Sequence, residues 1–298
     1  MNRISLRLSV CAVRFLLIAV EVLFYGTMER LLDLLLRRDS TVPLDRAALE
    51  LATIEFPELD IDGFLGVLDS YAAELGARVA GLDGRGYIRA ANHYLFEELG
   101  FRGNAADYYN PKNSCLNEVL TARTGIPITL SVVYIEIARR LDRCVAGIGL
   151  PGHFVVRYDD GLYSVFVDPF HGGNLLAPEQ CYTLARDVAG IETDPDPHWL
   201  EPVTKRDILT RMLRNLAVAY ASQSLNDKGV AALNLLIRAN PDSAEEYRQR
   251  GVLQMRAGRL TAAKDDLTRY LELARSAPDR DQVREQIQSI QHWLASLN

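Results

Sequence analysis

The apolar positions of this chain follow helical spacing over its first third and its last third, with strand-like runs only between them. Residues 60–75 repeat apolar side chains at steps of three and four, which predicts an amphipathic helix with Asp60 as its N-terminal cap. Shorter helices are predicted over Asp45–Ile54 and over Tyr87–Leu99, which Gly100 ends. Together these segments predict a helical lead-in.

The most apolar predicted helix is Ile128–Leu141. Its side chains are apolar on nearly every side, so it is expected to be the buried core helix of a domain, and Pro127 fits its first turn. A shorter helix, capped by Asn113 or Ser114, is predicted to run ahead of it to about Ala122.

Two β-rich runs, LPGHFVVRY and LYSVFVDPF, follow the core helix and are joined by a DDG turn, which predicts a β-hairpin. The hairpin places His153 near the start of one strand and Asp168 near the end of the other, and these positions are neighbours in an antiparallel pair. A histidine and an aspartate so placed can act as a base and its orienter, as in a Cys-His-Asp triad. The alternative is a strand-end histidine with a purely structural bond.

The tail turns helical at Lys205 and repeats with an offset of 34 residues, which aligns residues 216–220 with 250–254. This is the period of tetratricopeptide repeats. Two units and a final helix, Gln282–Leu297, are expected to pack against the central domain. Such repeats present a concave face to peptides or partner proteins, although the tail could instead be a helical buttress.

The first 27 residues form a separate problem. Residues 8–25 are largely apolar, but Arg14 and Glu21 interrupt them, and a charge in mid-membrane costs roughly 2.5–3.5 kcal/mol. Membrane association is therefore not favoured. Met28 opens an amphipathic pattern, and the favoured hypothesis is that Met28 is the natural start; a membrane-associated helix and a true signal sequence are the alternatives.

Length, charge and cysteine spacing exclude several classes of protein. The 298-residue chain is long enough for two or three domains, and its apolar share of 48% is ordinary for a globular protein. A net charge of −6 argues against a nucleic-acid surface. The four cysteines form no CxxC pair, which favours a reducing, cytoplasmic setting and predicts neither zinc ribbon nor disulfide scaffold. No nucleotide-binding glycine loop or metal-ligand spacing is visible, so no cofactor and no metal are expected.

Several runs resemble the bacterial Sir-B-one-type proteins of the transglutaminase-like superfamily: LFEELGFRGNAADYYNP, NSCLNEVL, TGIPITLSVVYIEIARRL, GIGLPGHFVVR and FVDPFHGG. The resemblance covers about Arg46–Ala189, and a tetratricopeptide-like tail is usual in that family. It implies an α+β fold: a helical lead-in, a papain-like core with a small antiparallel sheet, and a C-terminal all-α repeat region. The predicted segments are 1–27, 28–104, 105–192, 193–204 as linker, and 205–298.

The resemblance also implies a catalytic layout that this chain departs from. His153 and Asp168 match the superfamily's histidine and aspartate, but its nucleophilic cysteine lies in the first turn of the core helix. Here Thr129 and Ser131 occupy that turn. Hydroxyls are far weaker nucleophiles at neutral pH than a thiolate beside an imidazolium.

Cysteines elsewhere offer one substitute nucleophile. Cys115 stands at a predicted helix start, where the helix dipole lowers a thiol pKa, yet it also fits as a small hydrophobic residue facing the core. Cys144 and Cys181 are expected to be structural thiols, with Cys144 buried in a strand.

The remaining polar residues predict a cleft. Asn113, His171, Gly172 and Gly173 are expected to line it beside His153 and Asp168. The favoured function is a non-catalytic protein-interaction protein whose degenerate cleft and repeat tail bind a protein or peptide. The alternatives are a thiol-dependent peptide or amide hydrolase or acyltransferase using Cys115, His153 and Asp168, and a hydroxyl-based hydrolase using Thr129 or Ser131.

Overall fold

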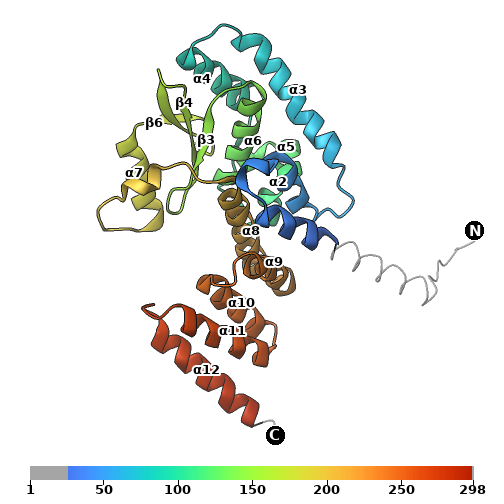
Figure 1. Ribbon diagram of the computed structural model, residues 1–298, viewed down its shortest axis with the longest axis vertical. Helices are drawn as coiled ribbons and strands as arrows, with labels where there is room; N and C mark the ends of the chain where they lie inside the picture. Colours follow the sequence, from blue (N-terminus) through green and yellow to red (C-terminus); the bar gives the residue numbers. More distant parts are fainter. Residues whose placement is uncertain (1–25, 297–298) are drawn as a thin grey trace, which may run out of the picture.

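The computed structural model describes residues 26–296, and Figure 1 shows a mixed α/β part above a descending stack of helices. The α/β part contains one four-stranded antiparallel sheet and a two-stranded parallel pair. This confirms the α+β class with a small antiparallel sheet and C-terminal helical repeats. The predictions for residues 1–25 lie outside the described residues.

The helical lead-in is more continuous than its sequence pattern indicates. Asp60 caps the longest helix of the described residues as predicted, because its carboxylate accepts from the amide of Gly63 at 3.0 Å. The next helix begins at Gly84 rather than Tyr87, since Asp83 caps it, and from His93 it continues as a π-helix. The lead-in comprises a helix over residues 26–36, η1 (Asp39–Thr41), α2 (Leu44–Ala52), α3 (Ile61–Val79), α4 (Gly84–Asn92) and η2 (His93–Glu98).

The core helix is α6 (Pro127–Arg140), which begins at the proline that the sequence placed in its first turn. The helix before it differs from the prediction: Cys115, and neither Asn113 nor Ser114, is its N-cap. Asn113 and Ser114 lie in a short 3-10 helix, where the side chain of Asn113 donates to the carbonyls of Asp107 and Tyr108. The elements here are β1 (Arg102–Gly103), η3 (Pro111–Ser114), α5 (Leu116–Ala122) and β2 (Thr124–Gly125), with β1 and β2 paired in parallel.

The sheet has the order β3-β4-β5-β6, and the predicted hairpin is its centre. Val156 pairs with Val167 and Asp159 with Ser164, which fixes the register of β4 against β5. Side chains alternate between the two faces: Val156 packs in the main core with α6, whereas Val155 packs in a smaller core with α7. Figure 1 shows the sheet between these two helices. The elements are β3 (Val145–Ile148), β4 (Val155–Asp159), β5 (Ser164–Asp168), β6 (Asn174–Leu176) and α7 (Pro178–Ala189).

The predicted linker is tied to the sheet edge. The amide of Val203 donates to the carbonyl of Gly147 at 2.9 Å, and Pro202 forms a β-bridge with Ile148. The chain then enters the tail directly, so that the tail starts at a fixed position. The elements from here on are η4 (Pro197–Leu200), α8 (Lys205–Ser222), α9 (Asn226–Ala239), α10 (Ala244–Arg256), α11 (Leu260–Leu273) and α12 (Arg280–Ala295).

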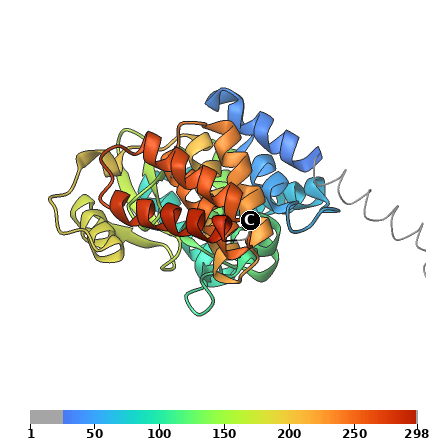
Figure 2. The ribbon, with the colours of Figure 1, turned by 90° about the horizontal axis from the view of Figure 1, so that it is seen from below.

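The tail packs on the α/β part as expected. Side chains of α8 and α9, including Met212, Leu216 and Leu233, belong to the same buried cluster as the lead-in helices and α6. A separate smaller cluster joins α11 to α12. Figure 2, seen from below, shows the repeat helices lying in front of the α/β part. In residues 26–296, no helix is both long and apolar enough to cross a membrane.

Candidate functional site

His153 and Asp168 meet at one end of the hairpin. His153 precedes β4, Asp168 is the last residue of β5, and the Nε2 atom of His153 lies 3.0 Å from Oδ2 of Asp168. Both side chains are buried, with exposed fractions of 5% and 2%. The predicted hydrogen bond between these two residues is therefore present.

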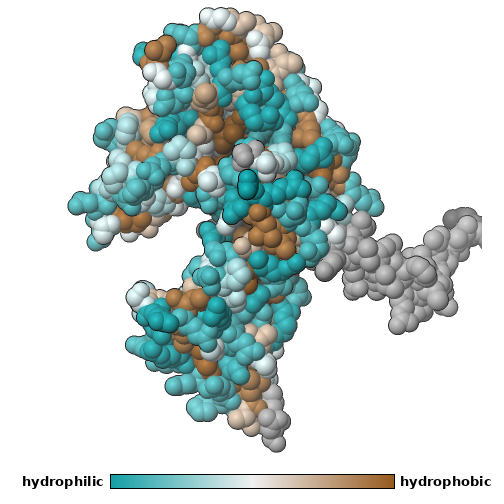
Figure 3. Space-filling model, in the orientation of Figure 1, coloured by the Kyte–Doolittle hydropathy of each residue, from teal (hydrophilic) through white to brown (hydrophobic). Residues whose placement is uncertain are grey.

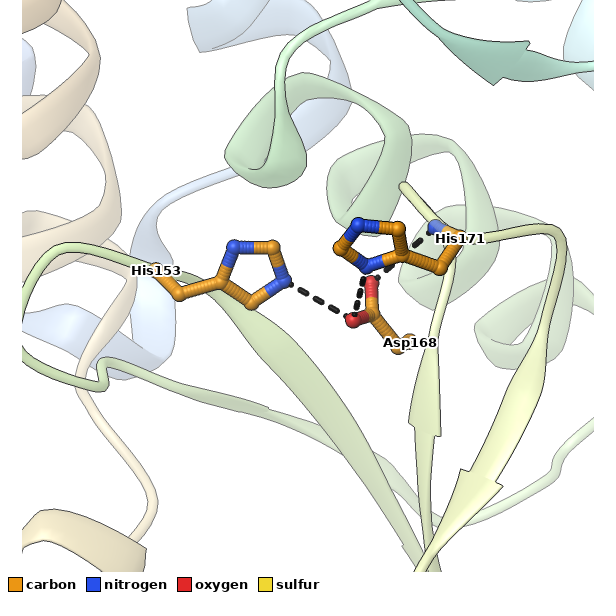
Figure 4. A group of neighbouring side chains, drawn as sticks. All are labelled: His153, Asp168 and His171. Atoms are coloured by element: carbon orange, nitrogen blue, oxygen red, sulfur yellow. Dashed lines mark hydrogen bonds and ion pairs between the residues drawn. The ribbon is translucent and has the colours of Figure 1, made fainter. Parts of the chain in front are cut away.

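A second imidazole reaches the same oxygen. The Nδ1 atom of His171 lies 2.7 Å from Oδ2 of Asp168, and the two imidazole rings stack with centroids 5.6 Å apart. Figure 4 shows both rings turned toward the carboxylate that lies between them. His171 is thus part of the group, as the sequence allowed, although half of its side chain is exposed.

The other carboxylate oxygen of Asp168 is held by the backbone. Oδ1 accepts from the amides of Phe170 at 3.0 Å and of His171 at 3.3 Å, and the carbonyl of Asp168 accepts from the amide of Gly173 at 2.8 Å. The turn after β5 therefore folds around its own aspartate. This turn fixes the direction of Oδ2 and brings His171 back over it.

The pKa of Asp168 is lowered from its ordinary value of 3.8. Burial acts to raise this pKa, but the hydrogen bonds and charges of His153 and His171 lower it by more. Asp168 is consequently a carboxylate at neutral pH, and it can orient both imidazoles.

Three residues that the sequence analysis did not assign to the site support His153. The ring of Phe170 packs edge-on against the His153 ring, with the ring centroids 6.0 Å apart, and the centroid of the Tyr108 ring lies 6.1 Å from that of Phe170. Arg211 of α8 donates to the carbonyl of His153 at 2.7 Å and to that of Leu150 at 2.9 Å. Tyr108 and Phe170 lie in the runs LFEELGFRGNAADYYNP and FVDPFHGG, which carry the family resemblance. Arg211 had no such signal, because it lies 58 residues after His153.

Thr129, at the expected nucleophile position, is occupied by structural bonds. Its hydroxyl is fully buried, donates to the carbonyl of Asn113 at 2.8 Å and accepts from the amide of Ile126 at 3.2 Å. The side chain of Asn113 donates in turn to the carbonyl of Asp107 at 2.7 Å and to that of Tyr108 at 3.1 Å. Asn113 therefore holds the tyrosine-bearing loop against the start of α6.

Ser131 is equally buried, with an exposed fraction of 0%, and its hydroxyl has no hydrogen-bond partner within the described residues. A hydroxyl enclosed in this way meets neither a base nor a substrate. Thr129 lies in the first turn of α6 as the sequence placed it, whereas Ser131 falls in the second turn because the helix begins at Pro127. Both side chains face the protein interior.

Cys115 is buried beneath the same region. Its sulfur lies 3.6 Å from the carbonyl oxygen of Pro111. Burial first, and then the charges of Glu55 and Glu118, raise the pKa of its thiol to about 12, against which Lys112 and Lys228 act weakly. Desolvation therefore outweighs the helix dipole that was expected to lower this pKa.

The other thiols differ from one another. Cys181 is buried in α7 as expected, and burial raises its pKa to about 12. Cys144 is exposed. The prediction of a buried Cys144 was wrong, because this residue lies just before the edge strand β3 rather than within it.

Thiol labelling tests these assignments. With a pKa near 12, the thiolate fraction of Cys115 at pH 7 is on the order of 10⁻⁵. We expect iodoacetamide to label Cys144 about 100-fold faster or more than Cys115 between pH 7 and 8, by peptide mass spectrometry of the folded protein. Cys181 is the matched buried control. Rapid labelling of Cys115 that disappears in His153→Ala would restore the thiol-hydrolase alternative.

The two glycines of the predicted cleft have different surroundings. Both have positive φ, +67° at Gly172 and +78° at Gly173. Gly172 faces open space, whereas Gly173 lies against Phe96 and Asn92, and its carbonyl accepts from the Asn92 side chain at 2.6 Å. Asn92 also accepts from the hydroxyl of Tyr134 in α6. Gly173 therefore anchors the His171 turn to the lead-in and the core helix.

Comparison with known proteins defines the class. Residues 63–214 match the model of the transglutaminase-like superfamily, and residues 216–288 match that of a tetratricopeptide repeat. The chain is therefore a transglutaminase-like domain followed by tetratricopeptide repeats.

Similar proteins identify the family to which the chain belongs. A UPF0162 protein of Xylella fastidiosa (strain 9a5c) is 38% identical over 252 residues, which cover 83% of this chain and 89% of that protein. A UPF0162 protein of Pseudomonas aeruginosa is 27% identical over 234 residues, or 78% of this chain and 84% of that protein. The chain belongs to the UPF0162 family. Human F-box only protein 21 is 30% identical over 174 residues, which cover 53% of this chain but only 26% of that protein.

Proposed function

We propose that this chain is a non-catalytic protein-interaction protein of the Sir-B-one type, in which the transglutaminase-like domain and the repeat tail bind a protein partner. The observation that carries the proposal is the state of the nucleophile position. Thr129 replaces the thiol there and is fully buried in bonds to Asn113 and Ile126. The His153–Asp168 pair then orients an imidazole without activating an attacking group from this turn.

The hydrolase alternative has weaker support. It requires a thiolate at Cys115, and burial raises the pKa of that thiol to about 12. The charges that act most on this thiol are those of Glu55, Glu118, Lys112 and Lys228. Its sulfur donates to the carbonyl of Pro111 at 3.6 Å, and within the described residues no hydrogen bond joins it to His153. A nucleophile and its base must lie within hydrogen-bond reach of each other. The properties of Cys115 are those of a packed apolar residue.

The repeat tail supports the proposal with an open surface. A groove of about 270 Å³ lies between α8 and α10, and Val218 and Val252 line it. Val218 is 42% exposed. A second groove between α10 and α12 contains Trp293, which is 51% exposed. Figure 3 shows apolar surface over the repeat helices among mostly hydrophilic residues. Apolar positions in such open grooves suit an extended peptide with apolar side chains.

Arg211 joins the His153–Asp168 pair to the repeat tail. Its guanidinium lies in α8, holds the carbonyls of Leu150 and His153, and packs over the ring of Phe154 at 5.4 Å. Burial lowers the pKa of this guanidinium, as expected for a cation taken out of water. A partner that binds the first repeat therefore acts on the same helix that positions His153.

A peptide-display selection against the full chain tests the proposal. We expect selected peptides to bind the parent chain and Thr268→Asp alike, since Thr268 is exposed on α11 outside both grooves. Val252→Asp should weaken binding at least 10-fold, about 1.4 kcal/mol, because it places a carboxylate beside the apolar side chains of Val218 and Leu253 in the groove. Circular dichroism melting of each variant checks folding.

Two outcomes would contradict the proposal. Equal binding by Val252→Asp and Thr268→Asp would remove the repeat groove from the interaction. Cleavage of the selected peptides by the parent chain, lost in His153→Ala and detected by mass spectrometry, would make the protein an enzyme.

A further inference from the structure

His153, Asp168 and His171 bring three metal-ligand atoms together at one point. One nitrogen of each imidazole and one oxygen of the carboxylate lie within 4.8 Å of one another. We propose that these three side chains form a binding site for one divalent transition-metal ion of the zinc class. The proposal goes beyond the interaction function and does not depend on it.

The distances suit a small metal ion. The two nitrogens lie 3.0 and 2.7 Å from the shared oxygen Oδ2. Ligands bound to zinc at about 2.0–2.2 Å are separated from each other by roughly 3.0–3.4 Å, depending on the coordination angle. To seat an ion, each N···O separation would widen by a few tenths of an ångström, and the two nitrogens, which lie within 4.8 Å of each other, would close to the same spacing.

The ligand atoms are also held in direction. Oδ1 of Asp168 is fixed by the amides of Phe170 and His171, so that Oδ2 points at the imidazoles. The His153 backbone is held by Arg211, and its ring is flanked by Phe170. Hydrogen-bonded supports of this kind orient the ligands of natural metal sites. The arrangement is preorganised rather than a chance meeting of surface residues.

The ligand types and the exposure of the three side chains limit which metal ions the site can bind. Two imidazoles and one carboxylate suit Zn²⁺, Co²⁺, Ni²⁺ or Fe²⁺ better than Ca²⁺ or Mg²⁺, which prefer oxygen ligands. His153 and Asp168 are buried, but half of the His171 side chain is exposed. A bound ion would therefore keep an open position on the His171 side, where water or an acidic group of a bound molecule completes its coordination.

Zinc titration of the untagged, chelator-stripped full chain tests the site. Isothermal titration calorimetry with ZnCl₂ should show one equivalent per chain, and Co²⁺ should give a visible absorption band of a low-coordinate nitrogen–oxygen site. We expect His171→Ala to weaken Zn²⁺ binding roughly 100-fold or more, since removing an outer-shell partner alone costs 10–100-fold. His171 is half-exposed, so this variant should remain folded, which thermal melting in EDTA checks.

The chain supplies matched controls. His93 lies 2.9 Å from a Glu97 oxygen and His198 lies 3.0 Å from a Glu201 oxygen, and both histidines are more than half exposed. His93→Ala and His198→Ala should leave the Zn²⁺ affinity unchanged.

Three results would overturn the proposal. Absence of Zn²⁺ and Co²⁺ binding by the parent chain is one. Undiminished binding in a folded His171→Ala variant is the second. Loss of binding in His93→Ala or His198→Ala, with His171→Ala unaffected, would assign the metal to adventitious surface pairs.

Discussion

Replacing Asp168 with alanine should lower the free energy of unfolding by about 3–5 kcal/mol, measured by urea denaturation in EDTA at pH 7. The carboxylate accepts four hydrogen bonds: two from the imidazoles of His153 and His171, and two from the amides of Phe170 and His171. The side chain is 2% exposed, so water cannot replace the lost acceptor at His153 without entering a buried site. Asp168→Ala removes all four bonds at once.

Two further variants separate the charge from the hydrogen bonds. Asp168→Asn keeps an oxygen for the backbone amides and offers an NH₂ group to the imidazoles, which can accept after a change of tautomer, so we expect a loss of about 1–3 kcal/mol. Asp159 is the matched control at the other end of the same hairpin. It is exposed and accepts only from the amide of Gly161. Asp159→Ala should cost about 1 kcal/mol or less.

The pH dependence of the Asp168 contribution follows from the direction of its pKa shift. The pKa of Asp168 is lower in the folded protein than its ordinary value of 3.8, so the folded state holds the ionised form more tightly than the unfolded state does. The stabilisation is complete above the unfolded-state pKa and is lost as the pH falls through the folded-state pKa. The difference between the parent chain and Asp168→Asn should therefore shrink only below about pH 3.8.

An equal loss of unfolding free energy from Asp168→Ala and Asp159→Ala would contradict the stabilising role given to the Asp168 hydrogen bonds.

The His153–Asp168 pair could be predicted from sequence because strand pairing is regular. Two alternating runs joined by a short turn fix which residues face each other, and the register of β4 against β5 follows from the turn. The start of α6 at Pro127 was predictable for a similar reason, since proline favours the first turn of a helix.

Other parts of the site depend on contacts that have no local pattern. Arg211 reaches the carbonyl of His153 from α8, in a different part of the chain. Asn113 looked like a helix cap, but its side chain bonds to the carbonyls of Asp107 and Tyr108, and the cap position falls to Cys115. In both cases tertiary hydrogen bonds decide the role of the side chain, so residue type and spacing alone do not.

The position of His171 lies between these cases. Its nearness in sequence to Asp168 predicted that it lines the cleft, yet its bond to Oδ2 requires the backbone to turn back over the carboxylate. That turn ends at Gly173, whose amide donates to the Asp168 carbonyl. The sequence HGG showed that a turn was present, but the direction of the turn depends on what Gly173 packs against.

Replacing Gly173 with alanine should therefore disturb the turn that positions His171. The new Cβ would lie 2.5 Å from Cδ2 of Phe96 and 2.9 Å from Cγ of Asn92, in a backbone conformation with φ of +78°. The left-handed conformation costs about 1–2 kcal/mol and the steric overlap about 1–3 kcal/mol, so we expect a total loss of about 2–5 kcal/mol in urea denaturation.

Gly172→Ala is the matched control for this effect, because Gly172 has a φ of +67° but no atom within 4 Å of the added Cβ. It should lose only the conformational part, about 1–2 kcal/mol. The difference between the two variants measures the packing of Gly173 on Phe96 and Asn92, which connects the His171 turn to α6 through Tyr134. Equal losses in the two variants would mean that Phe96 and Asn92 move aside freely.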